Sequence, residues 1–298
     1  MRGIGQCAES GAMRKVRNDG LATWAQYGSM NAKVFSFATA GRESATERLS
    51  REPPAGARES LAGGSLSDRV RELDWGRLSR DLDSSGNAVI EGLLSAAECQ
   101  DLAGLYGAEA PFRSRVVMGR HGFGRGEYKY FAYPLPAAVA ALRTAVYPYL
   151  VPIANRWNEH MGIDVTFPEE HAEFLTRCRK AGQSQPTPLL LQYQADDFNC
   201  LHQDLYGEHV FPLQLAVLLS QPGKDFTGGE FVMTEQRPRM QSRPEVVPLA
   251  QGDAVIFAVH YRPVQGTRGV YRVNLRHGVS RLRSGHRHTL GIIFHDAK

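Results

Sequence analysis

The sequence predicts an α+β fold in which N-terminal helices support a double-stranded β-helix, or jelly roll. Two sequence patterns, one on each side of Pro186, support this prediction. Downstream of Pro186, short β-like runs alternate with turn residues such as Gln221-Pro-Gly223, as they do in a double-sheet jelly roll. Upstream of it, apolar residues recur at helical spacing. We therefore expect a helical support region at 68–185 and a jelly-roll core at 186–298, forming one folded unit over 68–298.

Composition is that of a soluble globular protein. Of the 298 residues, 42% are hydrophobic and 22% are charged, which are ordinary values for that class. No apolar run approaches the length that spans a membrane, and the first residues lack the apolar stretch of a secretory signal. The four cysteines (Cys7, Cys99, Cys178 and Cys200) form no CxxC pair, which indicates reduced thiols without a zinc site or a disulfide framework. We expect a cytoplasmic protein with no membrane partner.

Residues 1–67 differ from the rest of the chain. They are rich in Gly, Ala, Ser and Arg and show no sustained apolar periodicity, so they bury too little surface to offset the entropy of ordering. We interpret them as a disordered tail, or as the product of a mis-annotated start codon. A basic nucleic-acid-binding arm is the alternative, which the acidic residues scattered through the stretch oppose.

The support region opens with helical signals. Apolar residues between 70 and 82 have the spacing of a short helix. Gly86-Asn87 reads as a turn, and the apolar residues up to Ile90 read as a strand. The sequence from Ser95 to Glu98 has the pattern of a capping box, which predicts a helix that runs to about Ala110.

The stretch 111–135 alternates glycines with aromatic and basic residues. Such a chain is mobile, yet it can stack on planar groups and bind anions. We weigh a substrate-facing loop or strand against an ordinary hairpin. Prolines and glycines then divide the following residues into three helices. These are expected at 137–147, where Pro148 interrupts the first helix, at 153–161, and from Pro168 to near Gly182.

The jelly-roll core is expected to consist of short strands that alternate with turns. Their predicted positions are 189–194, 200–205, 211–220, 230–235, 246–249, 253–259, 270–280 and 289–295.

The most informative motif lies at the end of one of these runs. His202 and Asp204 are two residues apart, so in a strand they project from the same face. His277, in another β-like run, can supply a second imidazole. Two imidazoles and one carboxylate, with the other metal positions open, suit non-haem iron(II) oxygen chemistry. A bare His-x-Asp arises often by chance, so the hypothesis depends on the motifs around it.

A candidate anion-binding pair follows His277. Arg287 has the planar guanidinium that binds carboxylates through two parallel hydrogen bonds. Thr289, on the same face of the same predicted strand, can add a hydroxyl hydrogen bond. The neighbouring His288 would point to the opposite face.

Taken in order, these motifs resemble those of the iron(II)/2-oxoglutarate-dependent dioxygenases of the prolyl-hydroxylase-like branch. The ordered set is Tyr193, His202-x-Asp204, Phe226-Thr-Gly-Gly-Glu-Phe231, Gly252-Asp-Ala-Val-Ile-Phe257, His277 and Arg287-x-Thr289. The closer resemblance is to a bacterial group of uncharacterised oxygenases for which oxidative repair of damaged DNA has been suggested. The superfamily likeness covers about 185–296, and the closer one runs from about residue 68 to the C-terminus.

The resemblance implies an enzyme that uses Fe(II), 2-oxoglutarate and O₂ to hydroxylate a C–H bond, with release of succinate and CO₂. It implies that the catalytic metal ligands are His202, Asp204 and His277, and that 2-oxoglutarate is bound by Arg287, Thr289 and Tyr193. One departure concerns the cosubstrate pocket. Where some prolyl hydroxylases carry a second tyrosine, this chain has the apolar residues 217–219.

The primary substrate stays open at this point. Hydroxylation of a protein or small molecule competes with oxidative demethylation of alkylated DNA or RNA. The arginine-rich segments 237–243 and 262–283 would suit a phosphate-bearing substrate, although arginine is simply the preferred base of this chain. A non-catalytic metal-binding jelly-roll module and a basic DNA-binding protein are the alternatives of other classes. The joint presence of the metal triad and Arg287 favours the enzyme over both.

Overall fold

The computed structural model describes residues 64–298. The expected tail at 1–67, together with its alternative as a basic arm, lies almost entirely outside the described residues, and so does Cys7.

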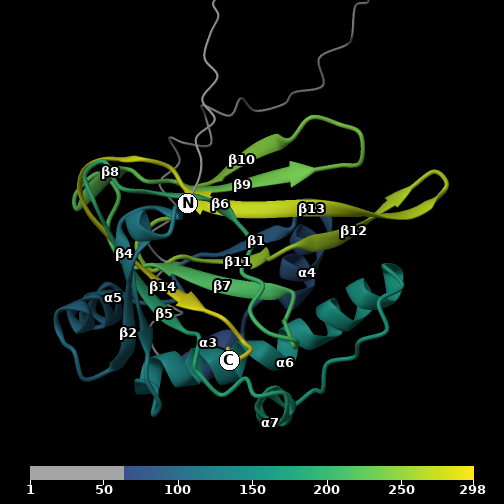
Figure 1. Cartoon of the computed structure of the whole chain (residues 1–298), viewed down its shortest axis with the longest axis horizontal. Coiled ribbons are helices and arrows are strands. Elements are labelled where there is room, and N and C mark those ends of the chain that lie inside the picture. The colour runs from purple at the N-terminus through teal and green to yellow at the C-terminus, as the bar shows by residue number, and fades with distance from the viewer. Residues whose placement is uncertain (1–63) are drawn as a thin grey trace, which may run out of the picture. The chain divides into compact units, whose positions relative to one another are not determined.

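Two antiparallel sheets form the core of residues 64–298 (Figure 1). The larger has eight strands in the order β1-β11-β7-β14-β5-β4-β2, with β8 paired to β14. The smaller has six strands in the order β10-β9-β13-β6-β3, with β12 paired to β13. The strands are β1 (Asn87–Ile90), β2 (Phe112–Val117), β3 (Gly124–Arg125), β4 (Glu127–Phe131), β5 (Leu189–Gln194), β6 (Phe198–His202), β7 (Leu213–Leu218), β8 (Phe226–Gly228), β9 (Phe231–Gln236), β10 (Arg243–Val247), β11 (Ala254–Ala258), β12 (Tyr261–Gly266), β13 (Gly269–Val279) and β14 (Leu282–Ile292). The predicted α+β fold with a jelly-roll core is confirmed.

The helices pack mainly against the larger sheet. They are α3 (Leu66–Arg71), α4 (Trp75–Ser85), α5 (Ala96–Gly104), α6 (Ala137–His160) and α7 (His171–Lys180), with short 3₁₀ turns η1 (Leu105–Gly107) and η2 (Met118–Arg120). Figure 1 shows α3, α6 and α7 on the side of the larger sheet that faces away from the smaller one. The space between the two sheets is therefore left for side chains of the strands and for the candidate site.

The first helices begin where side chains cap them. The predicted capping box is present, since the Ser95 side chain accepts from the Glu98 N–H and the Glu98 carboxylate accepts from the Ser95 N–H. The helix it starts is shorter than expected, because α5 ends at Gly104 and continues only as η1. The single helix expected over 70–82 is two helices, since the Asp74 side chain caps a new start at Trp75.

The helices expected at 137–147 and 153–161 are one continuous helix, α6. Pro148 and Pro152 lie inside it, four residues apart and both exposed. Each removes one backbone hydrogen bond, but water can satisfy the carbonyls freed on the exposed side. The opposite face, with Leu150 and Trp157 fully buried, packs without interruption. Packing of this face outweighs the local cost of the prolines.

Length and composition alone would let α6 cross a membrane, and it is the one helix among residues 64–298 for which this holds. Half of its most apolar stretch is buried inside the protein, and Arg143 in its middle forms a buried ion pair with Asp296. These contacts are those of a core helix.

The region 68–185 contributes strands as well as helices. The stretch 111–135 is a hairpin in which β2 pairs with β4, and β4 continues the larger sheet by pairing with β5. Between them, β3 pairs with β6 of the smaller sheet. The hairpin alternative therefore holds, and its connection also closes one side of the space between the sheets.

Most strands of the core lie near their predicted positions, and β5 matches its prediction exactly in both bounds. Two differences affect the site: β14 begins at Leu282 instead of residue 289 and so includes Arg287, and β6 ends at His202 instead of continuing to residue 205. Asp204 therefore follows the strand and does not belong to it. Two strands were not predicted: β8 has only three residues and includes Gly228, and β12 contains Pro263 and ends at Gly266.

Candidate metal centre and its cavity

Two side chains of the smaller sheet and one from the loop after β6 converge at the cavity. His277 on β13 lies directly across from His202 on β6, and their ring centroids are 4.2 Å apart. The Nε2 atoms of His202 and His277 are each 3.5 Å from an oxygen of Asp204, Oδ1 and Oδ2 respectively. The potential ligand atoms of the three residues all lie within 4.8 Å of one another. The structure thus brings together the residues predicted to form a metal site.

Local irregularity of β6 makes this convergence possible. The register with β13 shifts between His277 and Val279, so that Asn199 pairs with Val279 while His202 pairs with His277. Gly278 lies at this bulge, and a Cβ there would be 2.6 Å from the Asn199 carbonyl oxygen. Glycine therefore permits a close approach of the two strands that any side chain would block.

Neighbouring groups orient two of the three side chains. The Nδ1 atom of His202 is 2.8 Å from the Cys200 carbonyl oxygen, which leaves its Nε2 directed to the centre. The Tyr206 hydroxyl donates to Oδ1 of Asp204 at 2.8 Å. The His277 ring packs against Phe257, at 4.5 Å between centroids, and its buried Nδ1 has no hydrogen-bond partner among residues 64–298.

The electrostatics of the cluster favour a carboxylate beside neutral imidazoles. Burial by itself would raise the pKa of Asp204, but the hydrogen bond and charge of His277 and the charge of His202 outweigh it and hold this pKa well below its ordinary value. Burial, and then the charge of His202, lower the pKa of His277. An anionic carboxylate and neutral imidazole nitrogens are the protonation states that bind metal ions.

The predicted anion-binding residues lie together on the larger sheet. Arg287 on β14 is directly across from Tyr193 on β5, with its guanidinium 5.7 Å from the centre of the tyrosine ring. Arg287 is only 2% exposed. Among the described residues, its one hydrogen bond is donated by Nη1 to the Thr289 hydroxyl at 2.6 Å. No carboxylate among the described residues forms an ion pair with it, and its Nε and the Tyr193 hydroxyl are both buried without a partner.

These unpartnered groups destabilise the ligand-free protein, and a bound ligand can supply the missing hydrogen bonds. Burial lowers the pKa of Arg287 to about 10, and burial raises the pKa of Tyr193. A buried cation without an anion and a buried hydroxyl without an acceptor both cost free energy. A carboxylate placed between Arg287 and Tyr193 would satisfy both groups. The residues present therefore fit a dicarboxylate that also reaches the metal centre.

One cavity joins the metal centre to Arg287. It has a volume of about 230 Å³ and a largely apolar lining. Several of its lining residues were not predicted as site residues from the sequence. These are Phe123, Tyr128, Tyr130, Tyr206 and Gln214. Tyr206 could have been predicted as a site residue, since it lies two residues after Asp204. Gln214 could not, because the role of a glutamine in a buried strand becomes visible only from its neighbours in the structure.

Phe123 lies at the cavity on the connection between β2 and β4, although its side chain is 48% exposed. Its carbonyl oxygen accepts from the Cys200 N–H at 2.9 Å, and its ring stacks on His121 at 5.3 Å. Gly124 has φ +130, and a Cβ there would be 2.3 Å from the Phe198 carbonyl oxygen. This glycine fixes the segment directly against β6, so that an exposed aromatic ring is held beside the metal centre.

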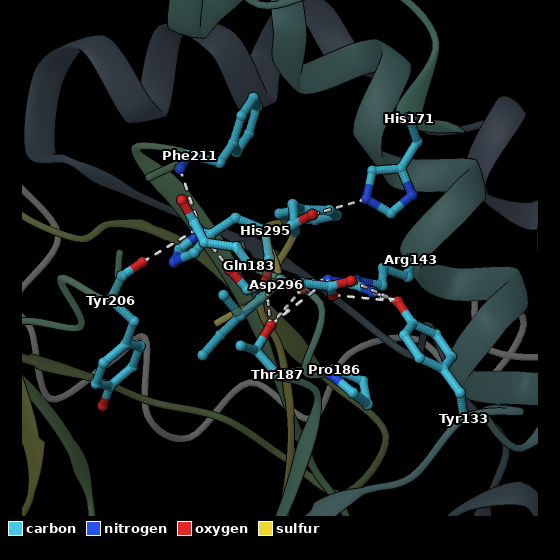
Figure 2. A network of polar contacts seen from close by, with 12 residues as sticks. Tyr133, Arg143, His171, Gln183, Pro186, Thr187, Tyr206, Phe211, His295 and Asp296 are labelled. Atoms are coloured by element: carbon cyan, nitrogen blue, oxygen red, sulfur yellow. Dashed lines mark hydrogen bonds and ion pairs between the residues drawn. The ribbon is translucent and has the colours of Figure 1, made fainter. Parts of the chain in front are cut away.

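The loop after Asp204 is held in place by a buried polar network (Figure 2). The side-chain oxygen of Gln183 accepts from the N–H groups of Glu208 and His209, at 2.9 and 2.8 Å. Its amide nitrogen donates to the Asp296 carbonyl oxygen at 2.6 Å. Gly207 has φ +86, and a Cβ there would be 2.4 Å from the Gln183 side chain. The network therefore fixes the segment that carries Tyr206 to the C-terminal end of the chain.

Part of the arginine-rich surface has a structural role. Arg262, 2% exposed, donates to the buried Glu235 and to the Asp83 carbonyl oxygen. Arg237 donates to the same carboxylate at 2.7 Å, and Arg243 lies 3.5 Å from it. These arginines join β9, β10 and β12 around one carboxylate. Other arginines of the two segments, including Arg239, Arg268, Arg276, Arg281 and Arg283, are exposed.

A jelly roll with two histidines and one carboxylate facing a cavity is the arrangement of non-haem oxygenases. Comparison with known proteins supports the same class of enzyme. Residues 126–297, more than half of the chain, match the family described as "Oxygenase, catalysing oxidative methylation of damaged DNA". Two uncharacterised proteins of Mycobacterium tuberculosis, MT2286 and Rv2227, are each 45% identical over 195 residues, which is 64% of this chain and 84% of the relative. The chain belongs to this oxygenase family.

The solved structures that match are more distant. A Pseudomonas putida prolyl-4-hydroxylase covers 75% of this chain and 99% of its own, with 12% identity and a TM-score of 0.43. An oxidoreductase of the 2OG-Fe(II) oxygenase family from Burkholderia pseudomallei covers 76% and 94%, with 16% identity and a TM-score of 0.46. The family membership rests on the sequence matches. The enzyme is an oxygenase, and the site agrees with the expected cofactors, which are Fe(II), 2-oxoglutarate and O₂.

Proposed function

We propose that this chain is an Fe(II)- and 2-oxoglutarate-dependent dioxygenase that hydroxylates a C–H bond of damaged nucleic acid. The observation that supports the class is the cavity itself, with three side chains that could hold a metal ion on and beside the smaller sheet and a buried arginine without an ion pair on the larger one. Bound iron and 2-oxoglutarate supply the oxidation, in which O₂ converts C–H to C–OH while 2-oxoglutarate becomes succinate and CO₂.

Each predicted site residue has a role in this proposal. A metal ion would be held by Nε2 of His202, Nε2 of His277 and the carboxylate of Asp204, which all face the cavity. Arg287 binds the distal carboxylate of 2-oxoglutarate, and Thr289 and Tyr193 add hydroxyl hydrogen bonds. The apolar lining excludes water around these groups and strengthens their electrostatic interactions.

The family description and the exposed arginines support nucleic acid as the substrate. If the carbon that is oxidised belongs to an N-methyl group on a base, hydroxylation gives an N–CH₂OH group, which loses formaldehyde and restores the unmodified base. Exposed arginines on the same half of the molecule can bind phosphates. The reaction would take place in the cytoplasm, where Cys99, Cys178 and Cys200, all free thiols in the structure, stay reduced.

The class is tested by titrating the protein with Fe(II) and 2-oxoglutarate without O₂, while recording the visible charge-transfer absorption of the chelate. O₂ is then admitted, and succinate is measured with and without candidate substrates. We expect the absorption band in the wild type and its loss in His202→Ala with the fold intact by circular dichroism. Turnover retained by His202→Ala would contradict the assignment of the metal site.

The substrate is tested separately with the same preparation. Oligonucleotides carrying N-methylated bases, proline-containing peptides and small metabolites are compared for stimulation of succinate formation and for product mass. Stimulation by methylated oligonucleotides is the expected result. Stimulation by peptides or metabolites alone would preserve the class and overturn the substrate.

A further inference from the structure

The cavity contains one buried polar side chain for which neither the metal nor 2-oxoglutarate accounts. Gln214, on β7, is 3% exposed and lines the cavity. Its Nε2 is buried without a hydrogen-bond partner, and no bond from its Oε1 to another described residue is present. Buried amides in proteins are nearly always hydrogen-bonded. An amide left free inside an enzyme cavity therefore points to a bound molecule as its partner.

The register of the larger sheet places Gln214 far from the 2-oxoglutarate end. Thr289 on β14 pairs with Leu218 on β7, so the position across from Arg287 is Ser220, two residues further along each strand. Six residues separate Ser220 from Gln214, which is roughly 20 Å along a strand. The backbone of Gln214 is therefore far along the sheet from Arg287, the residue proposed to hold the distal carboxylate of 2-oxoglutarate. This separation favours the primary substrate as the partner of the Gln214 amide.

Two aromatic side chains lie on the same face of the larger sheet as Gln214. Phe257 lies directly across from it on β11 and packs against the His277 ring, so Gln214 is close to the metal centre. Ala216, on the same face of β7, leaves room beside it. Tyr130 lies in the same cross-strand row as Ala216, through Leu189 and Gly291. Phe257 therefore lies on the strand next to Gln214, and Tyr130 lines the same cavity from three strands away.

We propose that Gln214 is a specificity-determining residue whose amide hydrogen-bonds the edge of an unpaired nucleobase in this part of the cavity. This proposal rests on the proposed function. An amide presents one donor and one acceptor side by side, and that pattern matches the edge of a base. Enzymes that modify a base take it out of the stack, hold it between aromatic side chains and recognise its edge by hydrogen bonds. The free amide, the aromatic lining and the nearby metal centre form such a site.

Gln203 provides a matched comparison. It lines the same cavity, but its amide is satisfied, since Nε2 donates to the Leu275 carbonyl oxygen at 2.6 Å and to Asn274 Oδ1 at 3.2 Å. Gln203 holds the protein together, whereas Gln214 is left for a ligand. The two glutamines should therefore respond in opposite ways to removal of the amide.

The experiment uses the full chain with Gln214→Met and Gln203→Met, since methionine is close to glutamine in length and volume. The probe is a single-stranded oligonucleotide with one N-methylated base. We expect Gln214→Met to lower kcat/KM for the oligonucleotide roughly tenfold or more, while the melting temperature stays the same or rises because an unsatisfied buried amide is removed. The Kd values for 2-oxoglutarate and Co(II) should stay within about twofold of wild type. Gln203→Met should instead lower the melting temperature.

Each of the other possible outcomes contradicts one specific part of the proposal. Equal oligonucleotide turnover by wild type and Gln214→Met would overturn the contact with the base and leave the proposed function standing. Weaker Co(II) binding by Gln214→Met would assign Gln214 to the unpartnered Nδ1 of His277 instead of the substrate. A lower melting temperature would mean that an ordered water satisfies the amide. Failure of the wild type to act on any oligonucleotide would overturn the proposed substrate, and the base contact with it.

Discussion

Two arginines of this protein, Arg143 and Arg287, are equally buried but differ in how many hydrogen bonds they form. In the network of Figure 2, Arg143 is 2% exposed and donates to the Ile293 and His295 carbonyl oxygens, to Asp296 and to the Tyr133 hydroxyl, at 2.8 to 3.0 Å. In the cavity, Arg287 is equally buried and has a single hydrogen bond, to Thr289.

This difference distinguishes a network that stabilises the fold from polar groups that are left to bind a ligand. A buried charge is tolerated when hydrogen bonds and a counter-ion surround it, and the cluster around Arg143 meets this condition. The unpartnered atoms of the cavity (on Tyr193, Gln214, His277 and Arg287) do not meet it within the protein. They lower stability in the absence of a ligand and gain their hydrogen bonds from what binds. Active sites commonly carry such a cost in stability.

The largest effect is expected in the satisfied network. Arg143→Met leaves the buried Asp296 carboxylate without its counter-ion, which costs about 3–5 kcal/mol of unfolding free energy. Urea denaturation at pH 7.5 measures this loss. Lys298→Met, a charge change at an exposed position next to the same segment, is the control and should leave stability within about 0.5 kcal/mol of wild type. An Arg143→Met protein as stable as wild type would show that the network is not structural.

The same region predicts a dependence of stability on pH. Burial, and then the charge of Arg143, lower the pKa of both His171 and His295 to about 4, from 6.5. Because the folded-state pKa lies below the unfolded one, the unfolded state binds more protons between these values. The stabilisation is complete above pH 6.5 and is lost as the pH falls toward 4. At pH 5 the loss is roughly 2 kcal/mol per histidine.

Urea titrations at pH 7.5 and pH 5.0 check this prediction, with His171→Gln as the comparison. Glutamine can still donate to the Phe294 carbonyl oxygen, which the His171 Nε2 contacts at 2.7 Å, but it does not titrate. The variant should lose about half of the pH dependence. An unchanged difference between the two pH values would mean that His171 does not contribute to it.

The unsatisfied arginine is expected to behave in the opposite way to Arg143. Arg287→Met removes a buried charge without an ion pair, so the melting temperature of the ligand-free protein should hold or rise. The KM for 2-oxoglutarate should increase by roughly 10- to 150-fold, the value of a hydrogen bond to a charged group. Arg283→Met, at an exposed position on the same strand, serves as the control for charge. A fall in stability without a change in KM would place Arg287 with the structural arginines.

A smaller effect is expected where the two regions meet. Tyr206 belongs to the loop that Gln183 holds, and its hydroxyl donates to Asp204. Removing that hydroxyl in Tyr206→Phe should lower the affinity for Co(II) or Fe(II) by about 10- to 100-fold, the usual effect of losing a group that orients a metal ligand. Isothermal titration calorimetry measures this affinity. The control is Tyr128→Phe, because Tyr128 lines the cavity and does not hydrogen-bond Asp204. Equal affinities in the two variants would exclude this positioning role.

The sequence by itself determined the fold class, the predicted metal ligands and the arginine candidate. The order of the motifs can be read directly from the sequence. The His-x-Asp spacing, the capping box of α5 and the bounds of β5 are in addition local features. These features are local because backbone geometry sets them within a few residues.

Tertiary structure decided the rest. Only packing makes α6 continuous through Pro148 and Pro152, because its buried face compensates for hydrogen bonds lost on the exposed face. Only the register of β7, β11 and β14 places Gln214 in the cavity near the metal centre, and only the surroundings show that Arg143 is satisfied while Arg287 is not. Satisfaction of a buried group depends on residues distant in sequence, so no local pattern reveals it.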